Sequence, residues 1–201
     1  MPRDIVSDQL GKGYHWDEHV FDALEPYLDG DVVDIGANVG SLTLRFAERA
    51  PRVIAYEPND EMVTRLRENV RLFGFEDKVV IRPVALYSYI TTMRPDMTSY
   101  PQSSWAWVQG GTTPAGPADW PDMERQVSAI KSDAQGADLR ALMGCETIIL
   151  RDHPRIVFEF EKDLSALHGH TWEDYVAALE RWGYAYRQVE PDHGDYFCEP
   201  R

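Results

Sequence analysis

Two glycines, an asparagine and an acid in the first third of the chain have the spacing of a nucleoside-binding site. The apolar run 32–35 leads into Gly36, Asn38 and Gly40, and about twenty residues later a second apolar run ends at Glu57. Glycine lets a backbone approach a ligand where a Cβ would clash. A carboxylate at the tip of the next strand can accept hydrogen bonds from both hydroxyls of a ribose.

The departures from a dinucleotide-binding motif indicate which nucleoside to expect. A G-x-G-x-x-G motif holds a pyrophosphate at a helix N-terminus. Here Asn38 replaces its second close-approach glycine, and Asp34, just before the turn, would repel a pyrophosphate. Both suit a ligand with a cationic, amino-acid-like head, such as S-adenosylmethionine. Asp34 would either contact the ammonium group of this ligand or orient the turn. The expected cofactor-binding residues are Asp34, Gly36, Asn38, Gly40, Glu57, Asp77 and Ala85, the last two beside the adenine.

Acidic side chains also end two later apolar strands. Lys131 and Asp133 share one side of a predicted strand because side chains alternate, and Glu159 ends the next strand. Asp133 could deprotonate a substrate hydroxyl, could bind Mg²⁺ together with Glu159, or could cap the following helix. His168, on a later loop, is another candidate proton acceptor because histidine titrates near neutrality. The candidate catalytic residues are Asp133, Lys131, Glu159 and His168, with Asp133 and Glu159 as the alternative metal ligands.

Strands that alternate with helices must position these residues. The apolar patterns predict strands at 31–35, 52–56, 79–84, 126–132 and 155–160, and helices at 16–28, 42–50, 59–73, 137–151 and 172–182. A hairpin of the segments 184–189 and 196–199 follows. This alternation is typical of a mostly parallel sheet with helices on both faces, which binds its ligand at the carboxyl ends of the strands.

The segment 88–125 breaks this pattern. It contains five prolines, three glycines and the tryptophans Trp105, Trp107 and Trp120. Disordered segments are poor in aromatic residues. We therefore expect an ordered lid or substrate wall, the alternative being a flap that closes a hydrophobic edge or forms an oligomer contact.

Four motifs together resemble the FkbM-type methyltransferases. They are VVDIGANVG at 32–40, AYEPN at 55–59, the segment 84–86, and IKSDAQGADLRALMG at 130–144. The family has VDIGANVG, FEPNP, a short A-L segment and IKIDVEGAE, so Gln135 departs from its usual glutamate, and 88–125 matches nothing. The resemblance covers about residues 30–190. It implies a class I S-adenosylmethionine-dependent methyltransferase with a Rossmann-like, seven-stranded, mostly parallel sheet, and one domain over 1–201 with a helical N-terminal segment at 1–29.

Charge and composition narrow the expected partners. The chain has 34 acidic and 20 basic residues, a net charge of −14, which disfavours duplex nucleic acid and anionic membranes as partners. Cys145 and Cys198 are expected to be reduced thiols of a cytoplasmic protein. Neither a signal peptide nor an apolar run of membrane-spanning length is apparent.

The function expected from these features is O-methylation of a hydroxyl on a small molecule or glycan. One alternative is a nucleic-acid or peptide methyltransferase on the same fold, since a fold does not determine the acceptor. The other is a cofactor-binding module without catalysis that acts through its tryptophan-rich segment. The oligomeric state stays open, with a homodimer among the alternatives.

Overall fold

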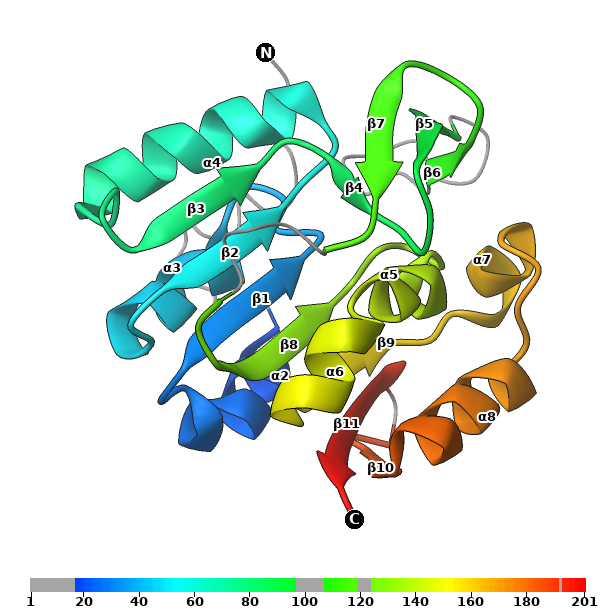
Figure 1. Cartoon of the computed structure of the whole chain (residues 1–201). Helices are drawn as coiled ribbons and strands as arrows, with labels where there is room; N and C mark the ends of the chain where they lie inside the picture. The colour runs from blue at the N-terminus through cyan, green and yellow to red at the C-terminus, as the bar shows by residue number, and fades with distance from the viewer. Residues whose placement is uncertain (1–16, 97–106, 119–123, 192) are drawn as a thin grey trace.

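Seven strands form the main sheet of the computed structural model, which describes residues 17–96, 107–118, 124–191 and 193–201. The sheet has the order β10-β11-β9-β8-β1-β2-β3, and its first five strands in the chain are parallel (Figure 1). The last two, β11 and β10, form an antiparallel hairpin beside β9. The predicted seven-stranded, mostly parallel sheet is therefore confirmed. The strands are β1 (Asp31–Ile35), β2 (Val53–Tyr56), β3 (Val79–Arg82), β8 (Val127–Ser132), β9 (Arg155–Glu159), β10 (Tyr184–Gln188) and β11 (Asp195–Pro200).

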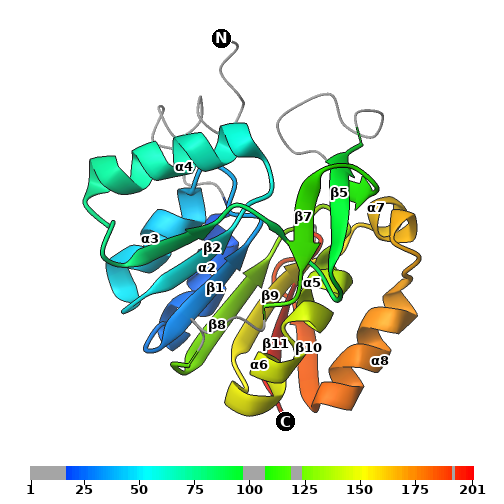
Figure 2. The same cartoon turned by 45° about the horizontal axis from the view of Figure 1, so that its top comes forward.

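Helices cover both faces of this sheet (Figure 2). Every residue of β1 is buried, and its side chains alternate between two apolar clusters. Val32 packs with α2, α3 and α4, whereas Val33 and Ile35 pack with α5, α6 and α8. The helices on the first face are α2 (Glu18–Leu24), α3 (Ser41–Arg49) and α4 (Asp60–Phe73). Those on the second face are α5 (Asp138–Gly144), α6 (Glu146–Asp152) and α8 (Trp172–Trp182).

The predicted ends of α4 and α8 are confirmed by their capping residues. The side chain of Asn59 accepts hydrogen bonds from the first turn of α4, and Gly74 ends that helix with φ 74°. Thr171 and Asp174 form a capping box at the start of α8, and Gly183 ends α8 with φ 80°. Glycine is suited to both ends because they lie in the left-handed region.

The helix predicted at 137–151 is wrong in one respect, since α5 and α6 are separate helices. A Cβ at Gly144 would lie 2.5 Å from the carbonyl oxygen of Tyr87, so this backbone packs against the chain beside it. The carbonyl oxygen of Gly144 accepts a hydrogen bond from the N–H of Ala118 at 2.9 Å. α5 therefore ends at Gly144, where the absence of a side chain permits this close packing, and α6 begins at Glu146.

Two smaller differences concern the helices at either end of the chain. The helix predicted at 16–28 ends at Leu24 and continues as the 3-10 turn η1 (Glu25–Tyr27), which contains Pro26. A short helix that was not predicted, α7 (Lys162–Leu167), precedes α8. Residues 1–16 of the predicted N-terminal segment lie outside the described residues.

The segment 88–125 forms strands where no regular element was predicted. They belong to a second sheet of four strands in the order β4-β7-β5-β6. This small sheet stands over the carboxyl ends of the main sheet (Figure 2). Trp105 and Trp120 lie outside the described residues, and Trp107 begins β6. The strands are β4 (Ala85–Leu86), β5 (Thr91–Pro95), β6 (Trp107–Gln109) and β7 (Thr113–Gly116).

Two further features concern the cysteines and the lengths of the helices. Cys145 and Cys198 are buried free thiols. Within the described ranges, none of the helices has the length and apolar character needed to cross a bilayer.

Candidate functional site

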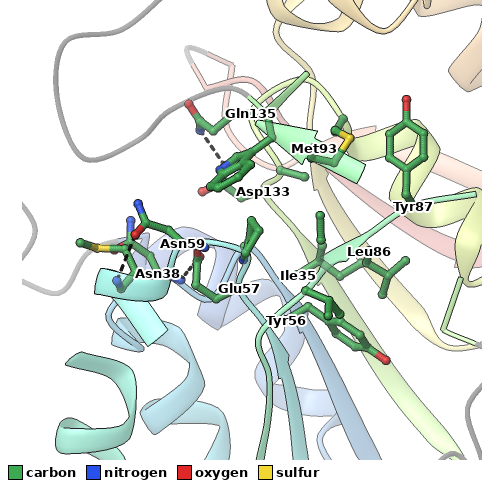
Figure 3. Close-up of a pocket in the computed structure, with 18 residues that line it drawn as sticks. Ile35, Asn38, Tyr56, Glu57, Asn59, Leu86, Tyr87, Met93, Asp133 and Gln135 are labelled. Carbon is green, nitrogen blue, oxygen red and sulfur yellow. Dashed lines mark hydrogen bonds between the residues drawn. The ribbon is translucent and has the colours of Figure 1, made fainter. Parts of the chain in front are cut away.

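A cavity lies at the carboxyl ends of β1, β2 and β8, beneath the small sheet (Figure 3). Its volume is about 700 Å³, including the space at its open mouth. This is the position where parallel α/β sheets bind ligands. Both sheets contribute to its walls, which are made by Ile35, Gly36, Asn38, Tyr56, Glu57, Pro58, Asn59, Met62, Val84, Ala85, Leu86, Tyr87, Met93, Trp107, Asp133, Ala134, Gln135 and Ala137.

The glycines of the first turn are required by packing within the protein. Gly36 has φ 73°, and a Cβ there would lie 1.9 Å from the carbonyl oxygen of Asp133. Gly40 has φ 95°, and a Cβ there would lie 2.5 Å from Leu66. These glycines therefore let the turn sit close to β8 and α4, which shapes the cavity wall without requiring a ligand.

Asn38 adopts a left-handed conformation without being glycine. Its φ is 51°, a conformation that asparagine tolerates better than most residues. The side-chain oxygen of Asn38 accepts a hydrogen bond from the N–H of Val39 at 2.8 Å, which stabilises the turn locally. Its own N–H points to Glu57.

Asp34 and Lys131 form a buried pair behind this turn. The ammonium nitrogen of Lys131 lies 3.3 Å from Asp34 and donates to the carbonyl oxygens of Ile35 and Gly36 at 3.2 and 3.0 Å. Thr43 donates to the other oxygen of Asp34 at 2.5 Å. Burial alone would lower the pKa of Lys131, but the surrounding carboxylates, Asp34 first, raise it above its ordinary value.

The position of this buried pair bears on the predicted roles of Asp34 in cofactor binding and of Lys131 in catalysis. Neither Asp34 nor Lys131 lines the cavity. Asp34 therefore fits the alternative in which it orients the turn, and Lys131 is a positioning residue rather than a group that reaches substrate. Its three contacts tie the end of β1 to β8 below the cavity floor.

Glu57 is held at the tip of β2 by two backbone groups. One carboxylate oxygen accepts the N–H of Asn38 and the other accepts the N–H of Asn59, both at 2.8 Å. The side chain is 6% exposed and lines the cavity. Each oxygen keeps a free lone pair, so the carboxylate can still accept two hydrogen bonds from a vicinal diol.

Burial raises the pKa of the Glu57 carboxyl to about 7. The N–H groups of Asn59 and Asn38 and the charge of Lys131 oppose this rise, whereas Asp133 adds to it. Near neutral pH the free protein therefore holds Glu57 partly protonated. A ligand that donates hydrogen bonds to both oxygens selects the ionised form.

Asp133 and Glu159 end the adjacent strands β8 and β9 and are bridged by Gln135. The side-chain nitrogen of Gln135 donates to Asp133 at 2.8 Å (Figure 3). It also donates to Glu159 at 3.3 Å. Burial, then Asp133 and Asp138, raise the pKa of Glu159 to about 10. The carboxyl group of Glu159 therefore favours its protonated form at neutral pH.

This arrangement does not fit the predicted Mg²⁺ site. A hard cation needs oxygen ligands facing it, whereas the side-chain nitrogen of Gln135 donates to both carboxyl groups and lies between them. The amide that lies between them belongs to Gln135, the position at which the FkbM-type motif has a glutamate.

His168 lies behind the cavity wall. Its Nδ1 is 3.3 Å from the hydroxyl of Tyr87, whose side chain lines the cavity while His168 does not. Burial, then the charges of His170 and Arg140, lower the pKa of His168 to about 4. A ring with this pKa is a weak proton acceptor, so the geometry does not support its predicted catalytic role.

The two residues predicted beside the adenine occupy different places. Ala85 lines the cavity from β4. Asp77 is exposed and precedes β3, at the amino edge of the sheet, so it lies at the opposite end of the strand from the cavity. Its position gives no support for a role in cofactor binding.

Several residues with a place in the site were not predicted. Asp138 is fully buried and accepts hydrogen bonds from Ser132 and from the N–H groups of Ala134 and Gly136. It thereby shapes the loop that carries Asp133, and its signal was an acid at the start of the helix that follows a strand. Three further residues of the cavity wall lie outside the sequence motifs, namely Met62, Tyr87 and Met93. Asn59, in contrast, ends the motif AYEPN, and Trp107 belongs to the segment for which a substrate wall was expected.

Sequence comparison gives no relative for this chain. No protein-family model matches it, and no curated protein does either. Comparison of structures, in contrast, gives many similar folds.

Three solved structures illustrate the structural similarity. Methyltransferase FkbM from Methylobacillus flagellatus has a TM-score of 0.59 and 17% identity, over 85% of this chain and 43% of its own. A Staphylococcus aureus protein assigned as a caffeoyl-CoA O-methyltransferase has a TM-score of 0.62 and 13% identity, over 99% of this chain and 93% of its own. Streptococcus mutans SMU.1697c, in complex with SAH, has a TM-score of 0.55 and 12% identity, over 90% and 94%.

These similarities establish the fold of the chain. It has the Rossmann-like fold of class I S-adenosylmethionine-dependent methyltransferases, as predicted. The chain spans less than half of the FkbM structure that it matches, 43% of that chain. The FkbM type itself stays a prediction from the sequence motifs.

Proposed function

We propose that this chain is an S-adenosylmethionine-dependent methyltransferase that methylates a hydroxyl group on a small molecule or glycan. The observation that carries the proposal is the position of Glu57 at the tip of β2, beside the turn of Gly36, Asn38 and Gly40. Two backbone N–H groups hold its carboxylate in the cavity wall, each at 2.8 Å. A carboxylate at this position is suited to the ribose hydroxyls of an adenosyl group.

S-adenosylmethionine, when bound, supplies an electrophilic methyl group. The chain must then hold the cofactor, orient the acceptor and remove a proton from its hydroxyl. Glu57 accepts the ribose hydroxyls, and Asp133 is the carboxyl group at the cavity that can accept the acceptor's proton. Gln135 holds Asp133 at 2.8 Å, which positions that carboxyl group.

The remainder of the cavity wall supports a small acceptor with an apolar or sugar-like face. Tyr87, Met93 and Trp107 contribute apolar surface from the small sheet, and aromatic walls of this kind suit sugar and polyketide rings. The small sheet also stands over the carboxyl ends of the main strands, where it can limit access of water (Figure 2). The net charge of −14 agrees with a neutral hydroxyl rather than a phosphorylated polymer.

Two measurements test this proposal together. Calorimetry should show binding of S-adenosylhomocysteine and none of a nicotinamide dinucleotide. Transfer of a labelled methyl group from S-adenosylmethionine should then occur to hydroxylated small molecules or sugars, and not to RNA or peptides, in one acceptor panel. Labelling of RNA or peptides alone would favour the nucleic-acid or peptide alternative. Cofactor binding with no transfer to any class would favour the non-catalytic module.

A further inference from the structure

A second group of ligating side chains lies outside the cavity. His19 lies in the first turn of α2. His193 lies in the turn between β10 and β11, and Asp195 is the first residue of β11. The Nε2 atom of His19 is 2.7 Å from Asp195, and the rings of His19 and His193 have centroids 4.4 Å apart. One ligand atom from each residue lies within 4.8 Å of the other two, the one such group of three or more found among the described residues.

The fold itself brings these three residues together. Asp195 lies opposite Glu159 in the antiparallel ladder of β11 and β9, at the edge of the sheet where the cavity opens. Its side chain shares a face with Phe197, two residues on, and Phe197 packs in the cluster that includes α2. The turn that carries His193 is closed by a hydrogen bond from Val189 to Asp195 at 2.9 Å. Residues 176 apart in sequence are thus held face to face by the core.

The chemistry of this group suits a transition-metal ion better than Mg²⁺ or Ca²⁺. Two imidazoles and one carboxylate are ligands that Zn²⁺ and Fe²⁺ accept, whereas hard cations prefer oxygen ligands alone. Glu190 lies 3.4 Å from His193, a position from which a carboxylate can orient a metal-bound imidazole. Three protein ligands leave at least one coordination position open.

The distances require only a small rearrangement. Ligands bound to Zn²⁺ at about 2.0–2.1 Å in tetrahedral geometry lie about 3.3 Å from one another. The His19–Asp195 pair at 2.7 Å must therefore open slightly, and the ligand atom of His193, which lies within 4.8 Å of the other two, must move closer to them. His193 can make this movement, because its side chain is 49% exposed at the tip of a hairpin.

We propose that His19, His193 and Asp195 bind a divalent transition-metal ion of the Zn²⁺ class, which ties α2 to the β10–β11 hairpin. The ordinary alternative is a His19–Asp195 hydrogen bond that only joins two surface elements. The two differ in what they require of His193. A metal ion needs its imidazole, whereas the hydrogen bond does not. The proposal is independent of the proposed methyl transfer, since it concerns other residues.

Metal titration of the untagged, chelator-treated protein tests the proposal. Calorimetry with ZnCl₂ should show one ion per chain. Binding should weaken more than about 100-fold in His193→Ala and in Asp195→Asn, because each removes a ligand. The control is His153→Asn, which removes an exposed imidazole outside the group and keeps a residue that tolerates its φ of 51°.

Stability and spectroscopy supply two further readings. Zn²⁺ at 100 times its dissociation constant for the wild-type chain should raise the Tm of that chain by about 5–10 °C, and the same concentration should raise the Tm of His193→Ala by no more than about 1 °C. Co²⁺ in place of Zn²⁺ should show the visible absorption of a site with nitrogen and oxygen ligands. S-adenosylhomocysteine binding by His193→Ala checks that the variant is folded. Absence of Zn²⁺ binding, or equal binding by His193→Ala and wild type, would overturn the proposal.

Discussion

Replacing Glu57 with glutamine tests the proposed ribose contact with little change of shape. The carboxylate accepts the N–H groups of Asn38 and Asn59 through its two oxygens. Glutamine keeps one acceptor oxygen and places an amide donor where the other stood, so only one of the two backbone N–H groups loses its acceptor. Glu57→Ala would leave both buried N–H groups without a partner and so would destabilise the turn as well. Glu57→Gln therefore separates ligand binding from folding more cleanly.

The expected loss follows from the hydrogen bonds involved. A hydrogen bond to a charged group contributes about 1.5–3 kcal/mol, and a neutral one about 1 kcal/mol. Glu57→Gln removes one ribose bond and weakens the other, while water compensates part of the loss. We expect binding of S-adenosylhomocysteine to weaken by about 1–3 kcal/mol, which is about 5- to 150-fold in the dissociation constant.

The pH dependence of the same equilibrium gives a second reading. Burial raises the pKa of Glu57 to about 7, and the ligand requires the ionised form. Below pH 7 the proton must leave before the ribose can bind, so affinity should fall about tenfold per pH unit. Above pH 7 affinity should be constant. In Glu57→Gln this dependence should disappear, because glutamine does not titrate.

Calorimetry between pH 5.5 and 8 on wild type and variant is the assay. Glu61→Gln is the matched control, since it removes an equal charge four residues away from a side chain that is 63% exposed. The control should bind as wild type does, with the same pH dependence. An unchanged dissociation constant in Glu57→Gln, or a loss equal to that of the control, would refute the ribose contact.

Three further predictions concern the remainder of the site. Asp133→Asn should reduce turnover by about 10²- to 10⁴-fold with nearly unchanged calorimetric affinity for S-adenosylhomocysteine, and normal turnover would exclude Asp133 as the base. Lys131→Met should lower the free energy of unfolding in urea by about 3–5 kcal/mol, because Asp34 loses its buried partner, and a loss under about 1 kcal/mol would contradict that account. Trp107→Ala should raise the acceptor's KM, and ligands should slow hydrogen exchange in β5–β7. If neither happens, the small sheet is structural or an oligomer contact.

The main sheet was predictable because its signals are local. The run that forms β1 is continuous and apolar, as expected for a strand buried on both faces. Asn59 and Gly74 mark the ends of α4 within a few residues of the helix itself. Glu57 could be placed at the cavity because it directly follows a parallel strand, and α/β sheets bind ligands at the carboxyl ends of such strands.

The small sheet and the residues behind the cavity wall were not predictable in the same way. Leu86 in β4 pairs with Gly116 in β7, and no local pattern records a partner so far along the chain. Prolines and glycines in this segment also resemble a loop. The burial of His168 behind Tyr87 likewise depends on a contact between residues that are far apart in the sequence. Asp77 was misplaced because it lies before β3, at the edge opposite the cavity.

A crystal structure with S-adenosylhomocysteine bound is the most direct test of cofactor binding in this cavity. We expect both ribose hydroxyls to lie within hydrogen-bonding distance of Glu57 and the sulfur atom to point toward the space beside Asp133. We also expect Gly36 and Asn38 to border the ligand. A ligand bound elsewhere, or in this cavity with its ribose away from Glu57, would contradict this expectation.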